Sequence, residues 1–323
     1  MKNSTLCIAA LLWALSIQGA QAQGYPSRAV RVISTFTPGS VADGAIRLIA
    51  QKMAASMEQP VVVEVQAGAG GILGGQTLVR SAPDGYTILH TTPATLVSTP
   101  YTLKVPPYDP LKDFTFITHL VDAGTCLLVA ASVPVNSVKD LIDYAKARPG
   151  VLAYGSNGIG GAYHLEMELL KLKYGLDITH VPYKGGQDGL NAAAAGQIPI
   201  AYAPAMSALA QARAGKVKVL AVLNKNRLPG IPDVPSMGEQ LVDYEKIPGG
   251  DEIVGPAGIP GAVLKRLHAE IIKALNTPEV QERMMKIGFI PVGNAPDEHA
   301  AQMRAAVDVF ARGRKAAQIE IEQ

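Results

Sequence analysis

Segments typical of β-strands alternate with segments typical of α-helices along most of the chain, and this order limits the possible folds more than any other feature. Residues 28–36 are rich in Val and Ile, and residues 44–57 repeat apolar side chains at the spacing of one helix face. Residues 61–65 and 86–92 are again strand-like, with a helix expected over 72–81. This βαβαβ order favours a parallel sheet with right-handed crossover connections.

A second series of the same kind follows. Strands are expected over 125–132, 152–156, 177–183, 198–204 and 216–224, and helices over 137–150, 165–175 and 187–196. Helices over 260–276 and 278–287 and a final helix complete the chain. We therefore predict an α/β fold of two lobes, lobe 1 from residues 23–124 plus 225–323 and lobe 2 from 125–224. A cleft should lie between the lobes, at the carboxyl ends of the strands.

The first 22 residues have the pattern of a secretory signal peptide. Lys2 precedes an apolar run over 6–17, and Ala20-Gln21-Ala22 fits a cleavage site. The formal net charge of +2 includes Lys2, so removal of this segment leaves +1, and no charge excess favours nucleic acid or an anionic membrane. Cys126 is then the single cysteine, and its apolar setting predicts a buried strand position.

The glycine-rich stretch 66–75 invites comparison with a dinucleotide-binding loop. Gly68, Gly70 and Gly74 are one residue out of step with G-x-G-x-x-G, and the acidic residue expected about 20 positions on is missing, since position 88 is Ile88. We therefore predict that these glycines allow a tight turn at a helix N-terminus. No nucleotide and no other cofactor is expected.

Catalytic and metal-binding patterns are weak. Ser156 lies in YGSNG, which lacks the first glycine of a nucleophile elbow, although Ser156, His164 and Asp188 could be drawn as a triad. The six histidines include no H-x-x-x-H pair, and no C-x-x-C occurs. We expect no catalysis and no metal, and keep a secreted hydrolase that uses Ser156 as an alternative.

Three short polar loops remain, at 37–43, 91–95 and 155–164. Each joins an expected strand to an expected helix, and Asp43 stands where an N-cap belongs. Helix N-termini offer free N–H groups and a positive dipole end, which suit carboxylates. The three loops should face one cleft, so we predict an anion-binding site there.

The sequence resembles the periplasmic receptors of tripartite tricarboxylate transporters, the Bug/TctC family. The resemblance rests on motifs in order along the mature chain, which are TPGSVAD, AGAGG, APDGYTIL, YDPLKDF, LAYGSNG, HVPYKGG, LPGIPDVPSMGE and GPAGIP. It implies a two-lobed periplasmic binding protein of the Venus-flytrap type, type II-like, with a parallel-rich sheet flanked by helices in each lobe. It further implies a protein that closes on a small organic acid and presents it to membrane permease subunits. We expect a monomer in the periplasm.

Carried over residue by residue, the resemblance implies a set of ligand-binding positions. The first loop contributes Pro38, Gly39, Ser40 and Asp43, the second Thr92 and Thr95, and the third Ser156, Asn157 and His164, while Phe36 and Tyr202 line the pocket. Lys184, in PYKG, is expected to be structural.

The departures from the family pattern bear on the ligand. Val41 stands where the first loop is usually glycine, and Ala203 replaces an acid. Residues 249–252 replace the usual aromatic side chains before GPAGIP. Asp251 or Glu252 could meet a cationic or hydroxylated ligand group, or both could face solvent. Dicarboxylates, tricarboxylates, aromatic acids and amino acids all remain possible ligands, and a sensory receptor is a further alternative.

Overall fold

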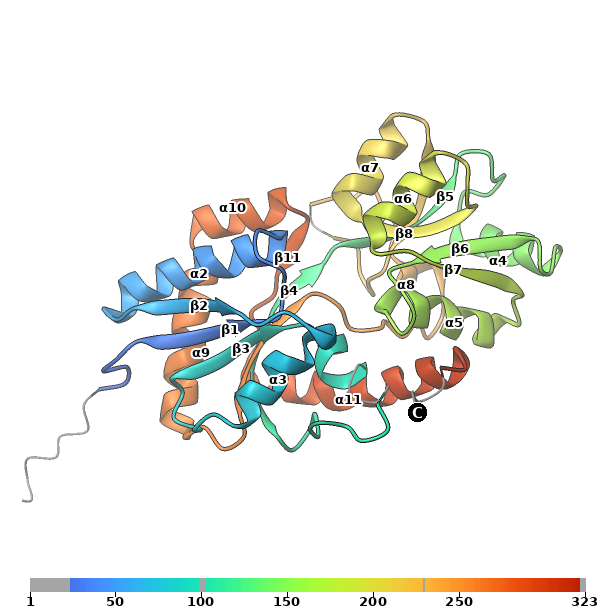
Figure 1. Ribbon diagram of the computed structural model, residues 1–323. Coiled ribbons are helices and arrows are strands. Elements are labelled where there is room, and N and C mark those ends of the chain that lie inside the picture. The colour runs from blue at the N-terminus through green and yellow to red at the C-terminus, as the bar shows by residue number, and fades with distance from the viewer. Residues whose placement is uncertain (1–23, 99–102, 229, 320–323) are drawn as a thin grey trace, which may run out of the picture.

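The computed structural model describes residues 24–98, 103–228 and 230–319, and its strands form two separate sheets (Figure 1). The expected signal peptide, residues 1–22, lies outside this part of the chain. Within it, no helix is both long enough and apolar enough to cross a bilayer.

The first sheet has six strands in the order β11-β4-β10-β3-β1-β2. Their bounds are β1 Val30–Ser34, β2 Val61–Val65, β3 Thr87–Thr91, β4 Phe114–Ala123, β10 Asp251–Pro256 and β11 Phe289–Pro291. β1 pairs in parallel with β2 and β3, as the βαβαβ order predicts. β10 is antiparallel to β3 and to β4, and it separates these two strands. The sheet is therefore mixed, because a strand from late in the chain enters its centre.

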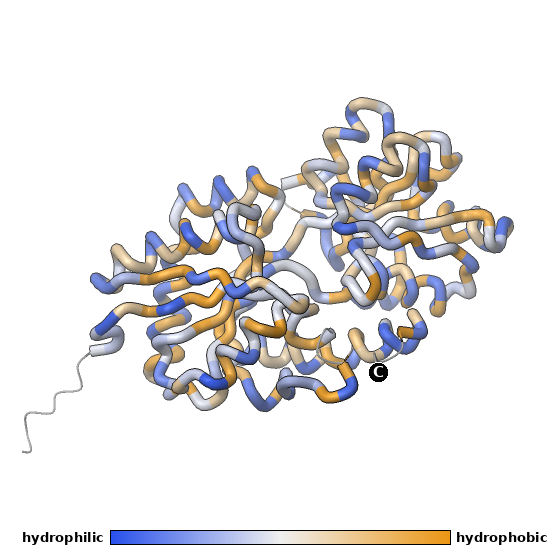
Figure 2. The backbone as a smooth tube through the Cα atoms, in the orientation of Figure 1, coloured by the Kyte–Doolittle hydropathy of each residue, from blue (hydrophilic) through white to orange (hydrophobic). Residues whose placement is uncertain are grey.

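Helices cover both faces of this sheet. Their bounds are α2 Val41–Met57, α3 Ile72–Val79, α9 Gly261–Leu275, α10 Pro278–Lys286 and α11 Pro296–Ala316. Val30 and Val32 of β1 pack into the core cluster that contains α2 and α9, whereas Ile33 packs with α3 and α11 on the opposite face. This is the two-residue alternation of a strand, and hydrophobic residues gather along the strands in Figure 2.

The second sheet has five strands in the order β7-β6-β8-β5-β9. Its elements are β5 Thr125–Ala130, β6 Leu152–Ser156, β7 Ile178–Pro182, β8 Ile200–Pro204, β9 Val217–Val222, α4 Val138–Lys146, α5 Ala162–Tyr174, α6 Gly186–Ala194, α7 Ala205–Arg213 and α8 Met237–Gln240. Every residue of β5 is buried. Cys126 is a buried free thiol on this strand, as predicted, and burial raises its pKa to about 12.

The chain passes from the first sheet to the second through one residue, Gly124, between β4 and β5. We keep the proposed boundary between lobe 1 and lobe 2 at this residue. A Cβ at Gly124 would lie 3.1 Å from the Gly288 carbonyl oxygen, so the passage is closely packed.

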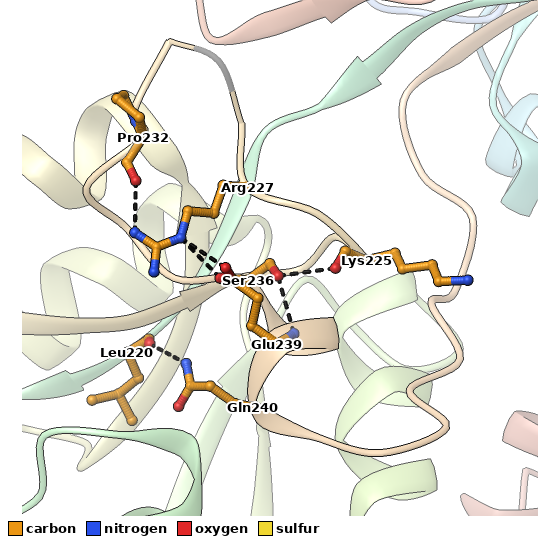
Figure 3. Close-up of polar contacts among 7 residues, drawn as sticks. All are labelled: Leu220, Lys225, Arg227, Pro232, Ser236, Glu239 and Gln240. Carbon is orange, nitrogen blue, oxygen red and sulfur yellow. Dashed lines mark hydrogen bonds and ion pairs between the residues drawn. The ribbon is translucent and has the colours of Figure 1, made fainter.

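The return passage from the second sheet to the first lies later than the predicted boundary between residues 224 and 225, because the segment after β9 still packs on the second sheet. Met237 and Leu241 belong to its core cluster. Ser236 and Glu239 form a capping box at α8, and Ser236 Oγ also donates to the Lys225 carbonyl oxygen at 3.0 Å (Figure 3). Gln240 Nε2 donates to Leu220 O at 2.9 Å. We keep the division into lobes as a proposal and extend lobe 2 through this segment.

The C-terminal helix α11 contacts elements of both sheets. It packs against β4 of the first sheet and against α5 of the second. Phe310 of α11 and Leu165 of α5 share one core cluster, and Figure 1 shows α11 running alongside α5. The two halves of the molecule are therefore joined by packing as well as by the chain.

Candidate ligand-binding site

The first loop, residues 37–43, ends at the N-terminus of α2. Ser40, and not Asp43 as expected, is the N-cap: Ser40 Oγ accepts a hydrogen bond from the Asp43 N–H at 3.2 Å. The Val41 and Ala42 N–H groups, at the first two helical positions, have no partner within a helix. The loop therefore presents two backbone donors at the positive end of the helix dipole.

Asp43 shapes this loop from inside the first turn of α2. Its carboxylate accepts from the Gly39 N–H at 2.9 Å and from Arg47 Nε at 3.0 Å, and the residue is buried. Burial alone would raise its pKa, but the hydrogen bonds from Arg47 and Gly39 hold that pKa below its ordinary value. Asp43 is thus an ionised group already paired with protein, and it fixes Gly39 in its positive-φ conformation.

Phe36 lies over a buried polar pair that sequence reasoning did not identify. Its ring packs against the His90 ring with centroids 4.7 Å apart. His90 Nε2 lies 3.1 Å from Asp251 Oδ2, and His90 Nδ1 lies 3.4 Å from Ser34 Oγ. Asp251 is thus connected to the first loop through His90.

The second loop is held by its two threonines. Thr92 Oγ1 accepts from the Thr95 N–H at 3.1 Å and lies at the same distance from Thr95 Oγ1. A single turn of π-helix follows over Ala94–Ser98. Thr92 is half-buried and Thr95 is buried, so Thr92 is the more accessible hydroxyl of the pair.

The glycine-rich turn packs closely against the second loop. Gly68, Gly70 and Gly71 all have positive φ, and a Cβ on Gly71 would lie 2.5 Å from Thr95 Cγ2. A Cβ on Gly74 would lie 2.8 Å from Thr35 Cγ2. The prediction of a tight turn at a helix N-terminus is confirmed, and the glycines also allow α3 to approach the loops closely.

The third loop is organised by side chains that accept backbone hydrogen bonds. Asn157 Oδ1 accepts from the Tyr163 N–H at 3.2 Å, and His164 Nδ1 accepts from the Gly160 N–H at 3.0 Å. Ser156 Oγ accepts from the Gly158 N–H at 3.1 Å. All three expected residues are therefore brought together at the N-terminus of α5.

Ser156 has a second partner, His180 of β7, whose Nε2 lies 2.6 Å from Ser156 Oγ. The His180 ring stacks on His164, with centroids 3.8 Å apart. The triad drawn from the sequence is not formed, because His180 occupies the place given to His164 and Asp188 is exposed on α6. His180 begins the HVPYKGG motif, which is the signal that could have identified it.

The second and third loops meet across the two sheets. Ser98 Oγ, at the end of the π-helical turn, donates to the Gly160 carbonyl oxygen at 3.4 Å. The first loop adjoins the second because β1 and β3 are parallel neighbours, and Thr35 Oγ1 donates to Thr91 Oγ1 at 3.1 Å. Contacts of residues in or next to the three polar loops thus connect the first loop region to the second and the second to the third.

Three expected ligand residues have surroundings that the sequence did not predict. Asp251 and Glu252 do not face solvent: their exposures are 3% and 0%, and they start the buried strand β10. Glu252 Oε2 lies 3.0 Å from His299 Nε2. Tyr202 is fully buried, stacks on Tyr163, and belongs to the core of the second sheet. Lys184 is exposed before α6.

Comparison with known proteins gives one consistent result. Residues 45–316 match the family model described as tripartite tricarboxylate transporter family receptor. A UPF0065 protein of Bordetella pertussis is 36% identical over 286 residues, which cover 88% of each chain. The structure of R. palustris Rpa4515 with adipate has 28% identity and a TM-score of 0.73, covering 91% of this chain and 98% of that one. MatC from Rhodopseudomonas palustris with bound malate has 27% identity and a TM-score of 0.69, covering 91% and 100%.

Proposed function

This chain belongs to the tripartite tricarboxylate transporter receptor family of periplasmic solute-binding proteins, and we propose that it captures a small organic acid between its two lobes. The ligand carboxylate would bind at the N-termini of α2 and α5, and the occupied protein would present it to membrane permease subunits. The proposal includes secretion through the N-terminal signal peptide, a monomeric receptor, and binding without catalysis.

The free N–H groups at the start of α2 are the observation that carries this proposal. Ser40 caps the Asp43 N–H and leaves those of Val41 and Ala42 for a ligand. Each helix terminus contributes about 0.3–1 kcal/mol, and each charge-assisted hydrogen bond about 1.5–3 kcal/mol. Two such termini with a few hydroxyl donors reach about −8 kcal/mol, which corresponds to micromolar affinity.

The α5 terminus supplies the second half of the proposed site. Its N-cap, Gly161, has no side-chain hydrogen bond, and Asn157 already accepts from the Tyr163 N–H. The Ala162 N–H, at the first helical position, is therefore left as a donor. A carboxylate that bridges α2 and α5 would bind the closed arrangement of the lobes more tightly than an open one, as ligand-driven closure requires.

The chemistry of the ligand is also a proposal. Two similar proteins have structures with adipate and with malate, both dicarboxylic acids. We propose a dicarboxylate of that size for this chain, with one carboxylate at the α2 and α5 termini. The accessible hydroxyl of Thr92 would contact the same group.

Calorimetric titration with adipate and malate, each matched by its neutral diamide, tests the proposal. We expect micromolar binding of at least one acid and binding about a hundredfold weaker for its diamide, because the amide carries no charge for the helix termini. Equal affinity for the acid and the diamide would contradict recognition of a carboxylate. Absence of binding by a wider panel of small acids would contradict the function itself.

A further inference from the structure

A second cluster of polar side chains lies inside the first lobe, apart from the three loops. His119 of β4 and Glu252 of β10 face each other in the antiparallel register, and His299 of α11 approaches from the helix layer. Their ligand atoms all lie within 4.8 Å of one another, and all three residues are buried. Residues from three separate elements thus converge on one point.

These three side chains are left without enough partners. His119 Nδ1, Glu252 Oε1 and His299 Nδ1 are buried and have no hydrogen-bond partner among the described residues. The neighbouring pair His90 and Asp251 is different, because His90 has a partner at each ring nitrogen. Buried polar atoms are nearly always paired, so three unpaired atoms in one cluster require an explanation.

A bound cation would satisfy this cluster. Glu252 is fully buried, and its hydrogen bond to His299 engages only Oε2. A divalent ion would balance the carboxylate and accept lone pairs from both imidazoles, since neutral imidazole is a metal ligand. Two histidines and one glutamate form a donor set that suits zinc, whereas calcium and magnesium require six or more oxygen ligands.

One member of the cluster, His119, borders a cavity. His119 lines a cavity of about 400 Å³ whose other walls include Asp122, Asn224, Lys246 and Gln302. Lys246 does not face this space as a free cation, because its Nζ lies 2.6 Å from Asp122 Oδ1. An ion could reach the His119 ring from this cavity, and a water in the cavity would supply a fourth ligand.

We propose that His119, Glu252 and His299 bind one divalent transition-metal ion, with zinc the first choice. Zinc bonds of about 2.0–2.1 Å place ligand atoms roughly 3.4 Å apart. His299 Nε2 and Glu252 Oε2 are already 3.0 Å apart, so these two atoms would exchange their hydrogen bond for bonds to the ion. The ion would connect β4, which leads into the Gly124 passage, with β10 and α11. It would therefore stabilise the part of the first lobe next to both passages between the sheets.

Metal titration of the protein, purified without a polyhistidine tag and treated with a chelator, tests this proposal. We expect one equivalent of Zn²⁺ in calorimetry and a rise in Tm that grows with Zn²⁺ concentration, as for any ligand selective for the folded state. His119→Ala and Glu252→Gln should each weaken Zn²⁺ binding by about tenfold or more. The control His268→Gln removes a more accessible imidazole and should leave the affinity unchanged.

A second measurement keeps the proposal testable if a variant fails to fold. Co²⁺ added to the wild-type protein should give the strong visible absorption of a four-coordinate site with nitrogen and oxygen ligands, and Zn²⁺ should displace it. Failure of the wild-type protein to bind either ion would overturn the proposal. Unchanged Zn²⁺ binding in a folded His119→Ala variant would overturn it as well, because the ion would then lie elsewhere.

Discussion

The imidazole rings of His164 and His180 stack with their centroids 3.8 Å apart and their planes 9° from parallel. Burial lowers the pKa of both rings, and His164 contributes to lowering that of His180, to about 4. Both rings are therefore neutral near pH 7. A ligand that contacts this part of the third loop would meet hydrogen-bonding groups and no imidazolium charge.

Stability should fall as the pH drops from 6.5 toward 4. The unfolded chain protonates His180 near 6.5, whereas the folded ring stays neutral until about pH 4, so the unfolded state binds more protons within this window. Thermal unfolding at a series of pH values measures the effect. His180→Gln keeps a hydrogen-bonding partner for Ser156 and should lose less stability over this range. The same loss in both proteins would show that His180 is not responsible.

Glu166 should give the opposite dependence of stability on pH. It lies on α5 and is hydrogen-bonded to Tyr244 and Ile247, in the segment that precedes β10. Burial raises the pKa of its carboxyl group to about 7, although Tyr244 and the Ile247 N–H donate hydrogen bonds to it. The folded protein therefore keeps this proton between pH 4.5 and 7 while the unfolded chain releases it. The stability contributed by this group is present at low pH and is lost as the pH rises through 7.

Glu166→Gln is the variant that checks this dependence. The glutamine amide cannot ionise, and its oxygen can still accept from the Tyr244 hydroxyl. We expect the variant to be more stable than the wild-type protein above pH 7, and to lose the decline between pH 4.5 and 7. Thermal or urea unfolding on both sides of pH 7 measures the difference. A decline that persists in the variant would assign the dependence to another group.

Ser40→Ala should weaken both folding and ligand binding. It removes an N-cap, which costs about 1 kcal/mol, and it frees the start of α2 from its fixed geometry. Ser137→Ala is a matched control, since Ser137 Oγ caps α4 by accepting from the Asp140 N–H at 3.0 Å. Both variants should lose similar stability, but only Ser40→Ala should lose affinity for the carboxylate. Equal affinity in the two variants would exclude the α2 terminus from the site.

Gly71→Ala should destabilise the protein by about 1–3 kcal/mol, because the residue has a φ of 91° and its new Cβ would collide with Thr95. The displaced threonine should also reduce ligand affinity. Gly44→Ala serves as the comparison: Gly44 lies within α2, and nothing is found within 4 Å of its added Cβ. That substitution should stabilise the protein by about 0.4–1 kcal/mol. Urea unfolding of the two variants measures the change in stability, and ligand titration measures the change in affinity.

The local pattern of the sequence was sufficient for much of the fold. The strands β2 and β6 have the predicted bounds, and Gly175, the last residue of the helix predicted over 165–175, is the C-cap of α5. These elements are defined by apolar periodicity and by capping residues close by in the chain. The three loops were also located correctly, because each follows a strand and precedes a helix.

The acidic strand β10 could not be predicted in this way. Its first two residues are Asp251 and Glu252, which normally indicate a surface position. They are buried because His90 and His299 lie beside them, at separations of 161 and 47 residues in the chain. For the same reason, the histidine spacing that argued against a metal said nothing about His119 and His299, which only the folded sheet brings together.

The strand order of the first sheet has a consequence for how the protein is built. β10 lies between β3 and β4, so these two strands cannot be joined into one sheet before β10, which ends at Pro256, is present. The last strand of the second sheet, β9, ends at Val222, and Met237 and Leu241 of its core cluster also precede β10. During synthesis, the second lobe can therefore complete its core first. A truncation after α8 would leave a folded second lobe beside an open, unpaired edge of β3, and the edge would favour aggregation.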